Sequence, residues 1–363
     1  MIFDVFSFYD VHFILCLIFE SLYRTNNKST DRMSLRSINA PSLVAAAGLS
    51  TLAGIPLLEA LTFSTSPAVL KGLNLAAFAA NVVAVSIPGR LDGQQDAAMR
   101  SGSINPTKPN ASRPEEGTPL NEESNSSSYS LNRSRTLVNP SGWAFAIWGP
   151  IYLGEAAFVT SQLFASDTSL VALNKMLPNV TAPFVAANLF QSLWCASFRP
   201  SYGEGWKKYI SVGMLAGTAY SLSLVNAAGY AAMVSADMVN QSYLLWPLAA
   251  HFGWTSAATL VNLNGSVASD KSATPRTLVA IGHSSAVIAT TLGVGITLAN
   301  SMPVYGLTLS WALAACADGM SHRIPTQRQE EEDVLSKAAD VQRKLCWTGS
   351  VLCALAAAYS CVS

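Results

Sequence analysis

The chain has 363 residues, of which 50% are hydrophobic and only 12% are charged, and its mean hydropathy is +0.30. A soluble domain carries roughly a quarter charged residues, so this chain lacks the polar residues needed to cover a water-facing surface. Its 22 basic and 22 acidic residues cancel, which argues against nucleic-acid binding, because that function requires a basic surface. We therefore expect a lipid bilayer around the protein and no nucleic acid among its partners.

The six cysteines follow neither a metal-binding nor a disulfide pattern. Cys195, Cys316, Cys353 and Cys361 fall in or near apolar runs, and no two cysteines have C-x-x-C spacing. We predict no metal site and interpret these thiols as small apolar side chains. Soluble catalytic motifs such as Walker A, H-E-x-x-H and a G-x-G-x-x-G after a strand are missing from the sequence. We predict no catalytic residues and favour a protein that is not an enzyme.

The first 66 residues allow two interpretations. Residues 12–19 are apolar but too short to cross a bilayer, whereas residues 43–62 are long enough and contain Pro56 and Glu59. In one interpretation residues 43–62 form an extra membrane helix. In the other, residues 1–66 are an N-terminal extension with a targeting function, because the segment that starts at Met33 resembles the start of a transit sequence.

Apolar runs recur through the rest of the chain. Lipid offers the backbone no hydrogen-bond partner, so each run is predicted to be a helix, and about 20 residues cover the roughly 30 Å of hydrocarbon. The sequence predicts an all-α, polytopic transmembrane helical bundle of about eight spans, with seven to nine as the range. The spans cover about residues 68–87, 142–164, 182–198, 209–231, 243–264, 277–299, 303–317 and 346–362.

Two polar segments interrupt this pattern. Residues 89–138 are rich in Ser, Asn, Pro, Glu and Arg and are predicted to form a disordered loop within the bundle of residues 67–317. Residues 318–363 are predicted to hold a polar connection and a C-terminal membrane helix. Lys and Arg gather in alternate connections, which should face the cytosol or its topological equivalent. The protein is thus expected to be integral and multi-pass, in an organelle, an endomembrane or another membrane.

Glu155 is the charged residue closest to the middle of a predicted span. A carboxyl inside hydrocarbon is costly unless it is neutral, paired or wet, so Glu155 is a candidate for binding a ligand or a proton. The alternative is a protonated carboxyl that bonds to a neighbouring helix. His251 and His283 lie in different spans and could ligate haem iron, although packing within the bundle is the simpler interpretation.

Aromatic residues recur in three of the predicted spans, namely Trp143, Phe145, Trp148, Tyr152, Trp194, Trp246 and Trp254. Tryptophan is ordinarily an anchor at the membrane interface. Here, however, amide side chains lie close in sequence, since Gln191 precedes Trp194 by three residues and Asn262 follows Trp254 by eight. Flat apolar faces beside a few polar groups suit a planar hydrophobic ligand.

Residues 139–154, NPSGWAFAIWGPIYLG, are similar to the signature of the tryptophan-rich sensory proteins, the TspO and peripheral-benzodiazepine-receptor-like membrane family. Three more segments resemble the longer, multi-helix branch of that family: residues 81–88 (NVVAVSIP), 188–198 (NLFQSLWCASF) and 253–262 (GWTSAATLVN). The resemblance extends from about residue 68 to the C-terminus. The chain departs from the shorter family members in the spacing of its paired tryptophans, and it carries Gln191 where they have Asn.

The resemblance implies a helical bundle with a pocket for a tetrapyrrole or a sterol-like ligand, used in transport or sensing. The matching positions are Trp143, Phe145, Trp148, Trp194, Trp254 and Asn262, and the residue patterns add Tyr152, Glu155 and Gln191. No cofactor is implied, although porphyrin or haem could be the ligand. The small residues Gly213 and Gly217 would also allow a homodimer.

The alternative function is a proton-coupled transporter of a small solute that uses Glu155. An enzyme that oxidises a bound tetrapyrrole is a third and less favoured function.

Overall fold

The computed structural model describes residues 39–86, 134–164, 171–197, 200–237, 239–326 and 328–362. Every regular element within these ranges is a helix, which confirms the predicted all-α class. The predictions for the apolar run 12–19, and for the polar loop as far as residue 133, lie outside the described residues.

The N-terminal half of the described chain contains five long helices and a short 3-10 segment. In chain order they are α3 (Pro41–Thr62), α4 (Pro67–Ser86), η1 (Gly142–Ile147), α7 (Trp148–Phe164), α8 (Val171–Ala196) and α9 (Ile210–Ser235). Both α3 and α4 pack against α8, and α8 also packs along α9. Helix α4 makes a further, lighter contact with α7.

The C-terminal half contains four long helices, and short 3-10 segments connect α8 to α10. The helices are α10 (Trp246–Ala268), α11 (Pro275–Asn300), α12 (Pro303–Ser321) and α13 (Gln329–Ser360), and the 3-10 segments are η2 (Pro200–Tyr202), η3 (Gly205–Tyr209) and η4 (Val239–Leu245). Helix α13 packs against both α11 and α12.

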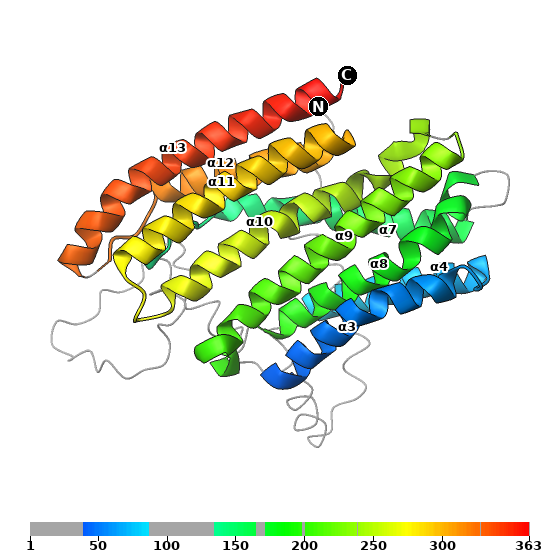
Figure 1. Ribbon diagram of the computed structural model, residues 1–363, viewed down its shortest axis with the longest axis horizontal. Helices are drawn as coiled ribbons and strands as arrows, with labels where there is room; N and C mark the ends of the chain where they lie inside the picture. The colour runs from blue at the N-terminus through cyan, green and yellow to red at the C-terminus, as the bar shows by residue number, and fades with distance from the viewer. Residues whose placement is uncertain are drawn as a thin grey trace, which may run out of the picture.

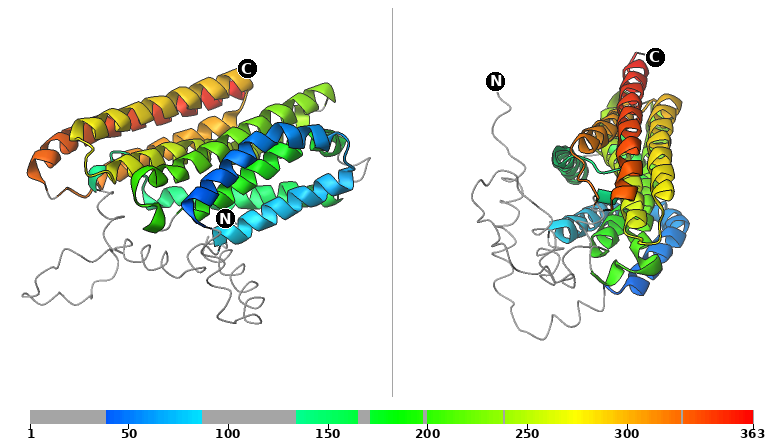
Figure 2. Two further views of the ribbon diagram at one scale, coloured as in Figure 1. Left: turned by 60° about the horizontal axis from the view of Figure 1, so that its bottom comes forward. Right: turned by 90° about the vertical axis from the view of Figure 1, so that its left-hand side faces the viewer.

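The helices run roughly side by side along the long axis of the molecule (Figure 1). Figures 1 and 2 show α3, α4 and α8 on one side and α11 to α13 on the other, with α9 and α10 between them. Helix α10 contacts α7, α9, α11 and α12, so it links the two halves. Side chains at the centre of the bundle therefore come from helices far apart in sequence.

Proline and one side-chain cap define several helix starts. Pro41, Pro275 and Pro303 occupy the first turn of α3, α11 and α12, where the missing N–H removes no helical hydrogen bond. At α11 the Thr274 hydroxyl also accepts a hydrogen bond of 3.2 Å from the Thr277 N–H. These starts follow directly from the sequence.

Within the described ranges, four helices are long and apolar enough to cross a membrane: Pro41–Thr62, Pro67–Val85, Gly205–Ser235 and Pro275–Asn300. The first two bury only 17% and 22% of their apolar windows, so most of their hydrophobic surface faces outward. An outward apolar surface of this extent is stable in lipid and costly in water. The molecule is therefore a helical membrane bundle.

Some boundaries differ from those expected from hydropathy. Helix α8 starts at Val171, eleven residues before the predicted span, because helical structure continues through a less apolar stretch that contains Lys175 and Pro178. Helix α13 is one element of 32 residues that joins the polar connection to the C-terminal span. Helix α3 gives residues 41–62 the form of the extra helix, one of the two interpretations for this segment.

The end of the predicted polar loop is anchored to the bundle. Leu137 and Val138 are buried, and the Arg135 guanidinium forms an ion pair with Glu331 Oε1 at 2.7 Å. The same guanidinium donates to the carbonyl oxygens of Ala268, Asp270 and Ala273, where α10 ends. These contacts order residues 134–138, which composition alone assigns to a disordered loop.

Candidate ligand site

Glu155 on α7 and His251 on α10 form a buried pair. The His251 Nδ1 lies 2.7 Å from Glu155 Oε1, and the two side chains are 2% and 1% exposed. A nitrogen and an oxygen this close share a proton, whichever of the two groups carries it. The Glu155 carboxyl is thus bonded to a side chain of a neighbouring helix, which is the contact that the second interpretation of this residue expects. It is also part of a group that can hold or release a proton.

Several polar atoms around this pair have no hydrogen-bond partner among the described residues. They include Glu155 Oε2, His251 Nε2, the Tyr152 hydroxyl, Asn81 Oδ1 and both terminal atoms of Gln191. The Tyr152 hydroxyl lies beside the amide groups of Asn81 and Gln191, yet none of these contacts has hydrogen-bond geometry. Buried polar groups in folded proteins nearly always have a partner. This group of unpaired atoms therefore requires an explanation.

Aromatic rings cover one side of the pair. The Trp148 ring stacks on Tyr152 with centroids 5.4 Å apart, and it meets His251 and Trp254 edge-on at 5.6 and 6.0 Å. Phe145 contacts Trp254 edge-on at 5.8 Å. Phe145 is 48% exposed and Trp254 is 4% exposed, so these rings extend from the molecular surface into the interior. We call Phe145, Trp148, Tyr152 and Trp254 the aromatic cluster.

Helical periodicity brings these side chains together. Trp148, Tyr152 and Glu155 are four and then three residues apart and so share one face of α7. A close approach of α7 to α10 completes the site, because a Cβ at Gly154 would lie 2.5 Å from Pro247 Cγ. Glycine is therefore needed at residue 154 for the two helices to pack at this distance.

Trp143 lies apart from the aromatic cluster. Its ring meets Trp311 of α12 edge-on at 4.7 Å, and its Nε1 donates to Asp318 Oδ2 at 2.9 Å. The Trp311 Nε1 in turn donates to the Ala144 carbonyl at 3.0 Å. Trp143 thus helps to attach η1 to α12, on an exposed part of the structure.

Trp194 and Asn262 also lie outside the aromatic cluster. Trp194 packs against a second group of apolar residues that includes Phe190 and Met214. The Asn262 Nδ2 donates to the Ala258 carbonyl of its own helix at 3.0 Å. Of the two predicted amides, only Gln191 lies beside the aromatic cluster, next to Tyr152.

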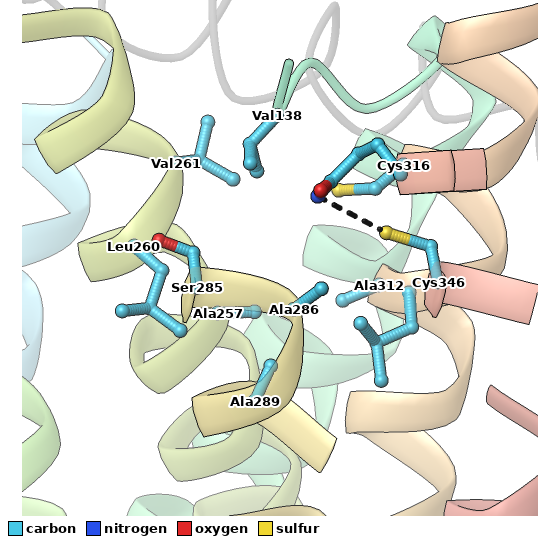
Figure 3. Close-up of a pocket in the computed structure, with 12 residues that line it drawn as sticks. Val138, Ala257, Leu260, Val261, Ser285, Ala286, Ala289, Ala312, Cys316 and Cys346 are labelled. Carbon is cyan, nitrogen blue, oxygen red and sulfur yellow. Dashed lines mark hydrogen bonds between the residues drawn. The ribbon is translucent and has the colours of Figure 1, made fainter. Parts of the chain in front are cut away.

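A small cavity lies between α10, α11, α12 and α13 (Figure 3). Its volume of about 20 Å³ has room for a single water molecule and is far too small for a porphyrin or a sterol. Its polar lining comes from Ser285, Cys316, Gln342 and Cys346, and the Gln342 Nε2 lies 3.5 Å from Cys346 Sγ. None of the predicted ligand-binding residues lines it.

Sequence reasoning missed the partner of Glu155 and the contribution of α4. The sequence indicates a haem ligand or a packed histidine at His251 and not the partner of Glu155, because a pair 96 residues apart leaves no local pattern. Asn81 Nδ2 donates to Asn188 Oδ1 at 3.0 Å, and both asparagines are buried. Each of them opens one of the segments that resemble the TspO family, which was the available signal.

A polar pair, an aromatic cluster and an apolar exterior together define a helical membrane protein with an internal polar site. The model of the family described as TSPO-like protein matches residues 116–330, more than half of the chain. The chain therefore belongs to the TSPO-like family, which confirms the resemblance seen in the sequence. The searches of curated proteins and of solved structures found no match.

Proposed function

We propose that this TspO-type membrane protein binds a planar hydrophobic ligand at the aromatic cluster, for transport or sensing. The observation that carries this proposal is the continuous set of rings from the exposed Phe145 to the buried Trp254, directly beside Glu155 and His251. Aromatic side chains with a few polar groups are typical of sites for flat, largely apolar molecules. A tetrapyrrole or a sterol-like molecule has this character, and a porphyrin or haem would be bound as ligand.

The packing of α4 supports entry of such a ligand from the lipid. Helix α4 packs closely along α8 but only lightly on α7, which carries Trp148 and Tyr152. Both of these rings are half-buried. A ligand dissolved in the bilayer would reach the aromatic cluster by separating α4 from α7, without crossing water. We propose a multi-pass arrangement, in an organelle, an endomembrane or another membrane.

The test uses the full-length protein in lipid nanodiscs, with protoporphyrin IX and cholesterol as probes. Saturable quenching of tryptophan fluorescence, or saturable binding of labelled cholesterol, is expected. Trp148→Ala removes the ring that contacts Tyr152, His251 and Trp254, so it should weaken binding at least tenfold, about 1.4 kcal/mol. Trp206→Ala is the matched control, because Trp206 is 58% exposed on η3 and belongs to no cluster of the site. Absence of saturable binding by both probes contradicts the proposal.

A second candidate is proton-coupled transport of a small solute, favoured by the Glu155 and His251 pair. The pair can accept or release a proton, and its two outer atoms are unpaired. Liposomes that contain the protein and a pH-sensitive dye should then show solute uptake with proton movement. Glu155→Gln should abolish both, since an amide cannot titrate. Uptake that is unchanged in this variant rules the second candidate out.

A further inference from the structure

We infer that the unpaired polar atoms of Asn81, Tyr152, Glu155, Gln191 and His251 form a subsite that accepts an uncharged hydrogen-bond donor group of the ligand, a hydroxyl or a ring N–H. We call these five residues the polar subsite. The inference rests on the proposed function, because the hydrophobic part of the same molecule would lie on the aromatic cluster. It adds the chemical class of the ligand, which must be amphiphilic and must not present an anion to the interior.

The unpaired atoms of the polar subsite are mostly acceptors. Asn81 Oδ1 can only accept, Glu155 Oε2 accepts when the carboxyl is ionised, and the Tyr152 hydroxyl can donate or accept. Gln191 offers one donor and one acceptor, and both of its terminal atoms are unpaired while the residue is 0% exposed. An O–H or N–H group in the middle of these atoms would donate to an oxygen and accept from the Gln191 amide. It would thus pair groups that are costly to bury alone.

The charged residues around the polar subsite disfavour an anionic group of the ligand there. The four helices that supply the subsite, α4, α7, α8 and α10, carry two lysines and no arginine, and their one histidine is His251 itself. The lysines are Lys71 and Lys175. Lys71 precedes Asn81 by ten residues, about 15 Å along α4, and Lys175 precedes Gln191 by sixteen, about 24 Å along α8. Because His251 is already bonded to Glu155, an anionic carboxylate placed there would add a second negative group without a cation of its own, and its desolvation would not be offset.

The aromatic cluster and the polar subsite share residues, so one ligand can occupy both. Tyr152 stacks on Trp148 with its ring, and its hydroxyl lies beside Asn81 and Gln191. The Trp148 ring also contacts the His251 ring edge-on. A flat ring system against Trp148 therefore directs its inner edge toward the polar subsite. Any acidic substituent would remain at the outer edge, near the exposed Phe145.

A second buried polar layer, on the same helices, provides a matched control. Asn74 Nδ2 donates to Gln162 Oε1 at 2.9 Å and to Thr181 Oγ1 at 3.2 Å. Asn74 lies seven residues before Asn81 on α4, and both are 0% exposed. Phe158 and Phe184, whose ring centroids are 5.6 Å apart, lie on α7 and α8 between the two polar layers in sequence. Asn74 therefore matches Asn81 in type and burial but lies outside the polar subsite.

The test compares three fluorescent probes that share one flat ring system: pyrene, 1-hydroxypyrene and 1-pyrenecarboxylate. Binding is measured at neutral pH in nanodiscs as the saturable part of energy transfer from tryptophan to the probe. The polar subsite predicts that 1-hydroxypyrene binds about tenfold more tightly than pyrene, because its hydroxyl finds partners. It also predicts that 1-pyrenecarboxylate binds no better than pyrene.

The variants locate this preference. In Asn81→Leu and in Gln191→Leu, the dissociation constants of pyrene and 1-hydroxypyrene should agree within about twofold, and pyrene should still bind. Asn74→Leu should keep the full difference between these two constants. Equal binding of all three probes, tightest binding of 1-pyrenecarboxylate, or loss of that difference in Asn74→Leu would each overturn the inference while leaving ligand binding established. If none of the three probes binds saturably, that result would instead contradict the proposed function itself.

Discussion

Two histidines in the bundle each have Nδ1 close to a side-chain oxygen of another helix, but the polar atoms around them differ in whether they have partners. His251 Nδ1 lies 2.7 Å from Glu155 Oε1, and His283 Nδ1 lies 2.7 Å from Gln342 Oε1. The Gln342 Nε2 continues to the Gly282 carbonyl at 3.1 Å, so this partner of His283 uses both ends of its amide. Glu155 Oε2 and His251 Nε2 have no partner. The partner of His283 is thus bonded at both ends of its amide, whereas the pair of His251 and Glu155 leaves two polar atoms unpaired.

This difference separates a structural network from a candidate site. Around His283, hydrogen bonds through Gln342 join α11 to α13, and a similar bond joins Asn264 Nδ2 to Ser285 Oγ at 2.7 Å. Such bonds hold helices together in a membrane. Around His251 the outer atoms of the pair, Glu155 Oε2 and His251 Nε2, have no partner among the described residues. A protein tolerates that cost where a ligand or a proton uses the atoms.

The largest expected effect comes from breaking the ionisable pair. Glu155→Leu leaves the His251 imidazole buried without its partner and should destabilise the protein by about 3 kcal/mol. Ligand binding should be lost as well. Thermal unfolding in detergent and probe binding in nanodiscs measure the two effects. An unchanged melting temperature would show that His251 gains nothing from Glu155.

Gln342→Leu makes the corresponding change in the structural network. It removes the partners of His283 Nδ1 and of the Gly282 carbonyl, so we expect a loss of about 2 kcal/mol in unfolding free energy. Ligand affinity should stay as in the parent protein, because none of these atoms belongs to the aromatic cluster or the polar subsite. A variant that is equally stable but binds less ligand would reverse the roles assigned to the two histidines.

Glycine substitutions test the helix contact that positions the ionisable pair. Gly154→Ala places a methyl group 2.5 Å from Pro247 Cγ and should cost about 1.5 kcal/mol, with a parallel loss of ligand affinity. Gly295→Ala is the control on α11, since a Cβ there meets no atom within 4 Å. It should leave stability unchanged or raise it by about 0.5 kcal/mol. Equal melting temperatures for the two variants would contradict the close contact between α7 and α10.

The smallest effect concerns an ion pair outside the membrane-spanning part. The Arg323 guanidinium donates to both Glu332 oxygens at 2.7 and 2.9 Å, and these bonds hold the pKa of Glu332 below its ordinary value of 4.5. The folded pKa is below the unfolded one, so the stabilisation is complete above pH 4.5 and disappears as the pH falls through the folded pKa. We expect this ion pair to contribute about 1 kcal/mol at most to the free energy of unfolding.

Glu332→Gln checks this dependence, since the variant has no carboxyl to protonate. Its stability should fall less than that of the parent protein between neutral pH and pH values below 4.5. Parallel unfolding curves over that range would show that the ion pair makes no contribution.

The helical class and most helices follow from the sequence because they depend on local properties. Continuous apolar runs give the spans, and proline marks the starts of α3, α11 and α12. The errors fall where packing outweighs hydropathy. Helix α8 continues upstream through Lys175 and Pro178, where α3 and α4 pack on it. Arg135 orders the end of a loop that composition assigns to disorder.

The candidate site was only partly predictable, since its contacts join distant segments. The sequence predicts Trp148, Tyr152 and Glu155 in one span, and their spacing along α7 puts them on one face of that helix. No local pattern could indicate that Trp143 turns toward α12 or that Asn262 bonds to its own helix. Their functional assignment stays a prediction.

Helix α13 has 32 residues and is about 48 Å long, whereas the hydrocarbon core of a bilayer measures roughly 30 Å. Helix α13 is therefore longer than the hydrocarbon core is thick, and its first turns are charged, with Glu331 and Glu332 among their residues. Arg135 is fastened to this charged start only seven residues before η1 begins at Gly142. A tilt of the start of α13 would therefore move Arg135 and the segment that follows it, which leads to the aromatic cluster. The ion pair between Arg135 and Glu331 therefore connects the charged start of α13 to the segment that leads into η1 and the aromatic cluster.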